Sequence, residues 1–417
     1  MSDSAAICRS CAGSDLRLVL SLGKVALADR LLTDQTLSEP EPTYSLTVYF
    51  CSDCGLMQIA ETVPPEVLFC NDYPYYSSFS PALLEHSHQN AEELIRTCSL
   101  GPDSLVVELA SNDGYLLKNF VEHGIPVLGI DPADGPTRIA QENGVETLCT
   151  FFTEELAHRL RGEGRAADVV IANNVLAHVA GLNDFVRGIG ALLKKNGTAV
   201  IEVPYVKDLV DNCEFDTIYH EHLCYFSVTA LMALFARHSL SLNDIRQLTI
   251  HGGSLRLYVG HEVDVSPRVT SLIEEEVTEK IDQFAYYQDF SGRVTKIRES
   301  LLDLLSGLKR EGKRIAAYGA AAKGATLINY VGIGKELIDF VVDRNIHKQG
   351  RYMPGKHLPI FAPERLVDEM PDYCLILAWN FADEIMEQQA EYVRRGGKFI
   401  VPVPQPRVLH NETASAG

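Results

Sequence analysis

The chain has 417 residues, 46% of them hydrophobic, and this length predicts two to three domains with ordinary packed cores. Its 56 acidic residues outnumber its 37 basic ones, and the resulting net charge of −19 argues against binding to nucleic acid. No apolar run reaches membrane-spanning length and the first residues do not resemble a secretory signal, so we expect a cytoplasmic protein without a membrane partner.

Two Cys-x-x-Cys pairs, Cys8/Cys11 and Cys51/Cys54, stand in the first 70 residues, with short β-prone runs between them. In a cytoplasmic chain they are expected to be thiols or metal ligands rather than disulfides. Each pair can direct two thiolates at one ion, and two pairs complete a tetrahedral zinc site, which we favour over a redox pair. Four cysteines leave no open coordination position, so the zinc is predicted to be structural.

From about residue 104 to 203, strand-like and helical patterns alternate. The strand-like runs are 105–109, 126–130, 168–172 and 198–203, and the helical stretches are 115–123, 136–143, 153–160 and 183–194. This alternation predicts an α/β fold with a parallel, doubly wound sheet.

The loop after the first strand reads Glu108-Leu109-Ala110-Ser111-Asn112-Asp113-Gly114-Tyr115, and its small residues let a ligand approach the backbone closely. A dinucleotide site would need Gly-x-Gly-x-x-Gly, but only Gly114 remains, with Ala110 and Asn112 in the other places. S-adenosylmethionine has no phosphate and tolerates this loop, so we predict the methyl donor rather than NAD. Asp131 ends the second strand and is placed to bind ribose hydroxyls. The alternative is that Glu108 and Asp131 are only polar strand ends.

The run from Asp168 to Val179 resembles the fourth strand of class I methyltransferases, where the chain passes the methionine part of the cofactor. It adds Asn173 and Asn174 to the predicted cofactor site. His178 follows the same strand and is either a structural or a substrate-binding histidine.

The segment Tyr219-His220-Glu221-His222 follows the last strand of this region. Ligands bind beyond the carboxyl ends of strands in such sheets, so we expect proton chemistry here. Alternation along an extended segment would separate Tyr219 and Glu221 from His222, so the segment should be irregular if all three line one site. The two histidines lack a third ligand, which disfavours a metal.

A mixed region, 227–265, precedes one or two amphipathic helices at about 270–310. Their apolar residues recur every three or four positions along the chain and include Ile273, Val277 and Ile281.

From Lys313 to Val403, strand-like runs at 314–318, 337–342, 373–377 and 398–403 predict a second Rossmann-like unit. Its first loop, 317–325, lacks the third glycine of a dinucleotide fingerprint and the end of a P-loop, so a nucleotide-sugar pocket is preferred. Lys323 in this loop either binds a substrate phosphate or caps the loop. The basic residues of 344–357 form a positive pocket or a solvated loop.

Taken in order, the cysteine pairs and the segments 107–114, 172–179, 219–222, 318–324 and 377–381 resemble the three-domain sugar C-methyltransferases of antibiotic and surface-glycan pathways. These enzymes methylate C3 of dTDP-4-keto-deoxysugars. The resemblance implies a small β-rich zinc-binding domain (1–72), a class I methyltransferase domain that binds S-adenosylmethionine (73–265), connecting helices (266–310) and a Rossmann-like substrate-binding domain (311–417). No obligate protein partner is evident.

For the active site, the resemblance implies His222 as the base, with Tyr219 and Glu221 beside it. The residues that it implies for the substrate are Tyr73, Tyr75, Tyr76 and Ser78 in an aromatic covering loop. His178, Lys323 and Asn380 are further candidates for binding the substrate. The alternatives are an O- or N-methyltransferase acting on a related nucleotide sugar, or an inactive binding protein.

Overall fold

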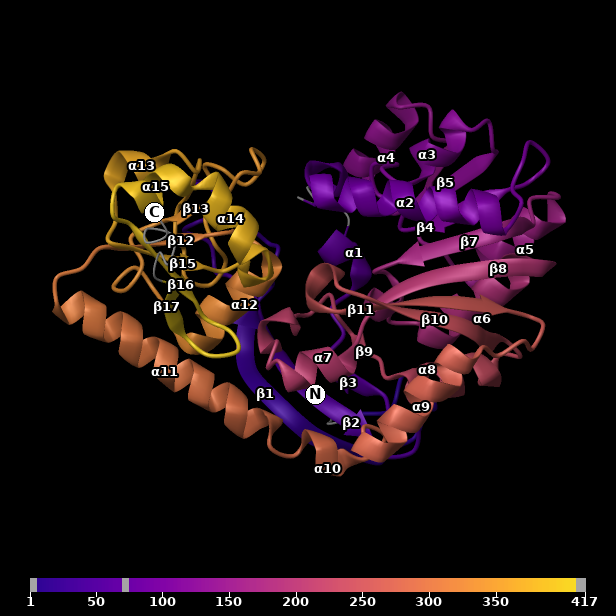
Figure 1. The fold of residues 1–417 in the computed structure, drawn as a ribbon, viewed down its shortest axis with the longest axis horizontal. Helices are drawn as coiled ribbons and strands as arrows, with labels where there is room; N and C mark the ends of the chain where they lie inside the picture. The colour runs from indigo at the N-terminus through magenta and orange to yellow at the C-terminus, as the bar shows by residue number, and fades with distance from the viewer. Residues whose placement is uncertain (1–5, 70–74, 410–417) are drawn as a thin grey trace, which may run out of the picture. The chain divides into compact units, whose positions relative to one another are not determined.

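The computed structural model describes residues 6–69 and 75–409, and its strands form three sheets (Figure 1). The chain divides into two units. The first contains Met1–Arg17, Tyr49–Lys207 and Leu223–Tyr286, and the second contains Leu18–Val48, Asp208–His222 and Tyr287–Gly417. Both units are therefore assembled from separated segments of the chain.

A seven-stranded sheet forms the centre of the first unit, in the order β10-β11-β8-β7-β4-β5-β6. The parallel strands are β4 (Val106–Leu109), β5 (Val127–Asp131), β6 (Thr147–Cys149), β7 (Ala167–Asn173) and β8 (Leu193–Pro204). β11 (Ser254–Gly260) runs antiparallel to β8, and β10 (Ser241–Leu248) runs antiparallel to β11. The order reverses between β4 and β7, which is the switch point where open α/β sheets bind ligands. The doubly wound sheet predicted from the alternating pattern is confirmed.

Helices α2 (Pro81–Thr97), α3 (Leu117–Glu122) and α4 (Asp134–Glu142) lie together over one face of this sheet (Figure 1). Their residues Leu94, Phe120 and Ala140 share one core with strand residues such as Val106 and Ile171. The remaining helices of the region are α5 (Glu154–Gly162), α6 (Leu182–Leu192), α7 (Val206–Asp211) and α8 (Val228–Arg237).

Helix starts follow local sequence rules. The side chains of Ser80, Thr153 and Ser227 accept hydrogen bonds from the first turns of α2, α5 and α8. These caps satisfy backbone N–H groups that have no partner within the helix.

A four-stranded sheet has the order β1-β2-β3-β9, formed by β1 (Leu16–Ala26), β2 (Thr43–Cys51), β3 (Met57–Ile59) and β9 (Cys224–Tyr225). β9 pairs antiparallel with β3, so that Met57 lies opposite Tyr225. The β-rich segment that carries the cysteine pairs therefore binds a strand that begins two residues after His222. The short helix α1 (Pro65–Phe69) follows β3.

The region expected as one or two helices contains three, α9 (Pro267–Glu279), α10 (Phe284–Tyr287) and α11 (Phe290–Arg310). Lys280 adopts a left-handed conformation (φ 63°) and ends α9. The apolar pattern was wrong at one position, because Val277 is 54% exposed whereas its neighbour Glu276 is fully buried.

The C-terminal sheet lies in the second unit and has the order β14-β13-β12-β15-β16-β17. It comprises β12 (Ile315–Tyr318), β13 (Val341–Val342), β14 (Ile360–Phe361), β15 (Tyr373–Ile376), β16 (Lys398–Val401) and the antiparallel β17 (Arg407–Leu409). Its helices are α12 (Ala322–Val331), α13 (Arg365–Glu369), α14 (Ala382–Gln388) and α15 (Ala390–Arg394). This sheet confirms the Rossmann-like prediction, and its switch point lies between β12 and β15.

Within the described ranges, no helix is both long enough and apolar enough to cross a lipid bilayer.

Candidate active site and zinc site

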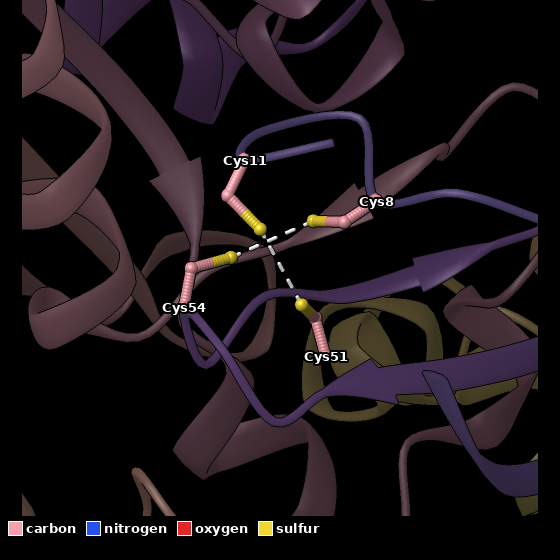
Figure 2. Close-up of side chains that lie close together, drawn as sticks. All are labelled: Cys8, Cys11, Cys51 and Cys54. Atoms are coloured by element: carbon pink, nitrogen blue, oxygen red, sulfur yellow. Dashed lines mark hydrogen bonds between the residues drawn. The ribbon is translucent and has the colours of Figure 1, made fainter. Parts of the chain in front are cut away.

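The four cysteines predicted to bind zinc converge (Figure 2). Their sulfur atoms all lie within 4.8 Å of one another, with Cys8 3.5 Å from Cys54 and Cys11 3.6 Å from Cys51. A backbone hydrogen bond turns each pair back on itself, from Ala12 N–H to Cys8 and from Gly55 N–H to Cys51. Four convergent sulfurs are the ligand set of a closed structural zinc site.

The thiols of the cluster differ in their pKa values. A hydrogen bond from the Cys54 thiol lowers the pKa of Cys8 to about 5, whereas burial raises the pKa of Cys51 to about 12. The cluster therefore stabilises one thiolate by itself, and a bound zinc ion would supply the positive charge that four thiolates need.

The first cysteine turn is fastened to two helices of the same unit. Arg237 at the end of α8 donates to the Ser10 hydroxyl (2.6 Å), and Asn183 of α6 donates to the Arg9 carbonyl (2.8 Å). The conformation of the metal-binding turn is therefore coupled to the packing of the methyltransferase helices.

The loop after β4 has the conformation of a glycine-rich loop, although alanine and asparagine replace two of the glycines. Ala110 and Asn112 both have positive φ angles, 57° and 49°. Such a conformation costs a non-glycine residue on the order of 1 kcal/mol and is concentrated at functional sites. Gly114 (φ 78°) is required for packing, because a Cβ there would lie 3.0 Å from a methyl group of Val145.

Asp131 holds this loop in place. Its buried carboxylate accepts hydrogen bonds from the backbone N–H of Asn112 (2.9 Å) and of Ala133 (2.8 Å). Burial raises its pKa, and these two N–H groups oppose that rise. Each oxygen retains acceptor capacity for a ligand hydroxyl.

Several polar atoms at the switch point are buried without a hydrogen-bond partner in the described structure, and Glu108 Oε2 and Asn173 Oδ1 are two of them. These two come from the ends of β4 and β7, and burial raises the pKa of Glu108 well above its usual range. Unpartnered buried acceptors indicate a missing ligand, because leaving them unpaired is costly. A ligand with hydroxyl and ammonium donors, such as S-adenosylmethionine, fits this loop.

The other predicted cofactor residues lie near by. Asn174 has a positive φ angle of 53° and donates its N–H to the Glu202 carbonyl (2.8 Å). Tyr115 is buried in the core under α2 and α3.

Part of the predicted aromatic loop lies against the cofactor loop. The N–H of Ser77 donates to the Asn112 side chain (2.9 Å), and the N–H of Ser78 donates to Asp113 (3.2 Å). Asn112 in turn donates to the Tyr75 carbonyl (3.2 Å). A Cβ on Gly135 would lie only 2.7 Å from the Tyr76 hydroxyl, so this tyrosine crosses the start of α4. Tyr73 lies outside the described residues, and His178 is placed in a short 3-10 helix after β7, with its ring 6.0 Å from Phe69.

Residues 219–222 form a turn, as the N–H of His222 bonds to the Tyr219 carbonyl (2.9 Å). The segment is irregular, and it stacks the rings of Tyr219 and His222 with their centroids 4.0 Å apart. His222 Nδ1 lies 2.7 Å from the Thr217 carbonyl, which can only accept, so this nitrogen carries the proton. Nε2 is then the basic nitrogen, and it accepts from the Tyr219 hydroxyl at 2.8 Å.

The two other side chains of this turn have different surroundings. His220 is buried, with Nε2 3.3 Å from the Ser45 carbonyl and its ring edge-on to Tyr44. Glu221 is buried too, and burial, together with the charge of Asp29, raises its pKa well above the usual range. The positive charge of Lys348 acts in the opposite direction.

Lys323 and Asn380 meet at the switch point of the C-terminal sheet. Lys323 Nζ donates to Asn380 Oδ1 (3.1 Å) and lies 3.7 Å from the centre of the Trp379 ring. Trp379 Nε1–H donates to Asp216 (2.7 Å), a fully buried residue that no sequence motif marks. Burial lowers the pKa of Lys323, and the negative charges of Asp216 and Glu214 raise it.

Two residues of the basic stretch 344–357 lie against carboxylates. Arg344 pairs with Glu384 (2.8 Å) and His357 pairs with Glu41 (3.2 Å). Lys348 donates to the Ala320 carbonyl (2.8 Å), which places it under the loop that carries Lys323.

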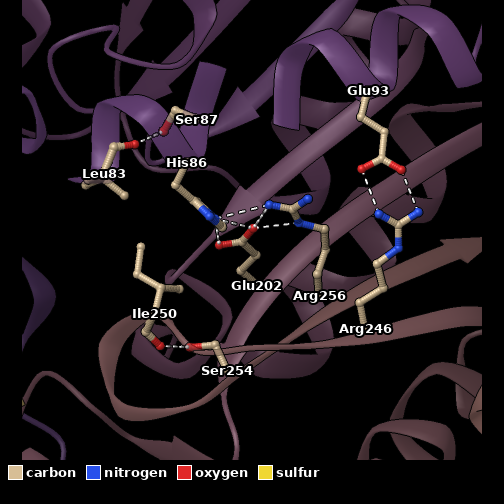
Figure 3. A network of polar contacts seen from close by, with 9 residues as sticks. All are labelled: Leu83, His86, Ser87, Glu93, Glu202, Arg246, Ile250, Ser254 and Arg256. Carbon is tan, nitrogen blue, oxygen red and sulfur yellow. Dashed lines mark hydrogen bonds and ion pairs between the residues drawn. The ribbon is translucent and has the colours of Figure 1, made fainter. Parts of the chain in front are cut away.

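A network of polar contacts that no sequence motif marks joins α2 to the central sheet (Figure 3). Glu202 on β8 lies opposite Arg256 on β11 and bonds to it at 2.7 Å, while His86 of α2 lies 2.9 Å from the same carboxylate. Burial raises the pKa of Glu202, but the His86 hydrogen bond and the Arg256 charge bring it below its usual value. Cross-strand register pairs Glu202 with Arg256, and the packing of α2 against the sheet adds His86.

Comparison with known proteins agrees with this architecture. Three family models match consecutive parts of the chain: a zinc binding domain (8–69), a methyltransferase domain (83–242) and a C-methyltransferase C-terminal domain (249–404). The C-methyltransferase NovU of Streptomyces niveus is 35% identical over 97% of both chains. A ubiquinone biosynthesis O-methyltransferase of Azorhizobium caulinodans is 28% identical over 23% of this chain and 38% of its own length.

A solved structure of magnesium protoporphyrin IX methyltransferase from Synechocystis PCC 6803 with bound SAH is 14% identical. It covers 43% of this chain and 83% of its own, with a TM-score of 0.35.

The sequence and the fold therefore define a class I methyltransferase with an added zinc-binding domain. The chain belongs to the family of S-adenosylmethionine-dependent C-methyltransferases that includes NovU.

Proposed function

We propose that this enzyme transfers a methyl group from S-adenosylmethionine to carbon C3 of a dTDP-linked 4-keto-deoxysugar, in cytoplasmic deoxysugar biosynthesis for an antibiotic or surface glycan. His222 is the base that forms the enolate. The observation that carries this proposal is the hydrogen bonding of His222, which leaves Nε2 as its acceptor nitrogen.

A carbon next to a carbonyl becomes nucleophilic when it loses a proton and the charge moves to the carbonyl oxygen. His222 Nε2 is suited to accept that proton, because an imidazole titrates near neutral pH. The Tyr219 hydroxyl now donates to Nε2, and a bound substrate would offer the C4 oxygen as a competing acceptor. Donation to the oxygen would stabilise the enolate and leave Nε2 to take the C3 proton.

When bound, S-adenosylmethionine supplies an electrophilic methyl group on sulfur. Asp131 and the backbone of the 110–114 loop are the residues that would hold it, and Glu108 and Asn173 offer it acceptors. These remain predicted contacts. The name of NovU and that of the C-terminal family model favour carbon over oxygen or nitrogen as the methylated atom.

The sugar nucleotide is proposed from the sequence resemblance and from the position of Lys323 and Asn380 at the C-terminal switch point. The proposal assigns Tyr75, Tyr76, Ser78 and His178 to the substrate as well.

The test is exchange of the C3 proton of a dTDP-4-keto-deoxysugar with deuterated solvent, followed by NMR without the methyl donor. We expect exchange by the wild type and a loss of about 100-fold or more in His222→Asn. His158→Asn, which changes an exposed histidine of α5, is the matched control and should exchange normally. Wild-type protein that exchanges no 4-keto sugar, or a His222→Asn variant as fast as wild type, would refute the proposal.

A further inference from the structure

We infer that Trp379 and Asp216 are positioning residues for His222, so that a side chain of the C-terminal Rossmann-like sheet sets the tautomer of the base. The inference depends on the proposed role of His222 for its catalytic consequence. The hydrogen bonds that carry it lie within one unit of the structure.

The connection begins at the Thr217 carbonyl. This oxygen accepts the Nδ1 proton of His222 at 2.7 Å, and the acceptor thereby decides which ring nitrogen keeps its lone pair. A histidine without such an acceptor exchanges freely between two tautomers. The base therefore depends on the orientation of one peptide group.

That peptide group belongs to the short 3-10 helix η3 (Phe215–Thr217). Its internal bonds are few, with the Thr217 N–H (3.0 Å) and hydroxyl (2.7 Å) both donating to the Glu214 carbonyl. A three-residue helix cannot fix its own orientation, because nucleation of a turn is unfavourable without tertiary contacts.

Two contacts from the C-terminal part of the chain hold η3. Phe215 packs edge-on against Tyr330 of α12, with ring centroids 5.4 Å apart. Asp216 accepts the indole N–H of Trp379 at 2.7 Å and is fully buried, and its second oxygen, Oδ1, has no partner in the described structure. An aromatic contact tolerates rotation, whereas this buried hydrogen bond has one favourable direction.

Trp379 is itself held at the site proposed for the substrate. Lys323 Nζ lies over its ring at 3.7 Å and bonds to the neighbouring Asn380. Lys323 therefore contacts Trp379, and Trp379 donates a hydrogen bond to Asp216. Asp216 precedes Thr217 in the chain, and the Thr217 carbonyl bonds to His222. The residues that would hold the sugar nucleotide also orient the base.

The alternative is that the Trp379–Asp216 bond only stabilises the fold. Trp379→Phe separates the two, because phenylalanine keeps a ring under Lys323 but removes the N–H donor. Tyr392→Phe is the matched control, since it removes one buried aromatic hydrogen bond, from Tyr392 of α15 to the Pro371 carbonyl (2.9 Å), elsewhere in the same unit.

The experiment measures the ¹⁵N shifts of histidine-labelled protein, with the His222 signals assigned by their loss in His222→Asn, together with C3 proton exchange. In the wild type, Nδ1 should have the shift of a protonated nitrogen and Nε2 that of an unprotonated one. We expect Trp379→Phe to give a tautomer mixture and to slow exchange about tenfold. Tyr392→Phe should leave the His222 shifts and the rate of exchange unchanged. The thermal midpoint of each variant is measured as well.

Unchanged His222 shifts and exchange in Trp379→Phe would overturn the inference, while the loss of exchange in His222→Asn would leave the proposed function intact. Equal slowing by Tyr392→Phe would also overturn it, because the effect would then follow stability. If His222→Asn exchanges normally, the proposed function is the part that fails. Should Trp379→Phe not fold, Asp216→Ala removes the same bond and provides the same comparison.

Discussion

The hydrogen bonds of His222 show how a single carbonyl can define a base, and the neighbouring residues carry several ionisable groups. Two buried carboxylates, Glu214 and Asp216, flank one ammonium group, that of Lys323. Burial raises the pKa of both carboxyl groups, and that of Glu214 reaches about 7, with the Lys323 charge opposing the rise. Two buried carboxyl groups share a single ammonium group here, so pH should affect the stability of the folded protein.

The first prediction concerns Glu214→Gln. The unfolded carboxyl loses its proton near pH 4.5, whereas the folded one keeps it to about pH 7. The folded state binds more protons in that window, so its stability falls as pH rises from 4.5 to 7 and is level above. Glutamine removes this cost, up to about 3 kcal/mol. The variant should gain thermal midpoint over wild type at pH 8 but little at pH 5, and equal differences at both pH values would contradict this.

The second prediction uses Trp379, the only tryptophan of the chain. Because Lys323 lies over its ring, a nucleotide sugar that engages Lys323 should change the tryptophan fluorescence. Titration of a dTDP-sugar should give a saturable change, and Lys323→Met should weaken the affinity about tenfold. Lys335→Met, at an exposed lysine, serves as control. A signal unaffected by Lys323→Met would remove Lys323 from the substrate site.

At the scale of elements, Glu276 explains how α8 and α9 are joined. Its buried carboxylate accepts hydrogen bonds from the N–H groups of Val228 (2.6 Å) and Thr229 (2.8 Å), and from the Tyr205 hydroxyl (2.9 Å). Negative charge at a helix N-terminus is favourable, and here it comes from another helix. This carboxylate therefore holds the start of α8, the helix that follows β9 in the chain.

The third prediction follows from these bonds. Glu276→Ala leaves buried donors without an acceptor and should lower the free energy of unfolding by about 3 kcal/mol, measured by urea denaturation. Glu275→Ala, at the exposed neighbour in the same helix, should change it by less than about 0.5 kcal/mol. Similar values for the two variants would mean that the Glu276 bonds contribute little.

At the scale of the whole molecule, the zinc site joins distant parts of the chain within the first unit. The cysteine turns carry the hydrogen bonds to α6 and α8, and the second pair leads into β3, which pairs with β9. Zinc therefore stabilises more than its own small segment, because its ligands anchor contacts with the methyltransferase core.

The fourth prediction is that the purified protein contains one zinc ion, measured by mass spectrometry. Cys51→Ala should lose the metal and lower the thermal midpoint by about 10 °C, as the wild type should after chelation. Cys149→Ala, at an exposed cysteine outside the cluster, should keep both. Full zinc content in Cys51→Ala would show that the four sulfurs are not the ligand set.

Much of the architecture could be predicted from local patterns. The strands and helices of 104–203, the cysteine cluster and the second Rossmann-like unit are confirmed, because spacing and periodicity are properties of neighbouring residues. Val277 and Glu276 show where this fails. An apolar residue at the expected spacing faces solvent, and an acidic one is buried because four donor groups of three distant residues surround it.

The sequence by itself determined the chemistry available to this protein: four thiolates at zinc-binding spacing, a loop suited to a cofactor without phosphates, and a tyrosine and two histidines in one turn. Only the tertiary structure decided which nitrogen of His222 carries the proton and which residues surround Lys323. Thr217, Asp216 and Trp379 have no motif, since their roles come from hydrogen bonds that join residues up to 163 positions apart. Such bonds depend on how the sheets bring loop ends together, and no local pattern records that distance.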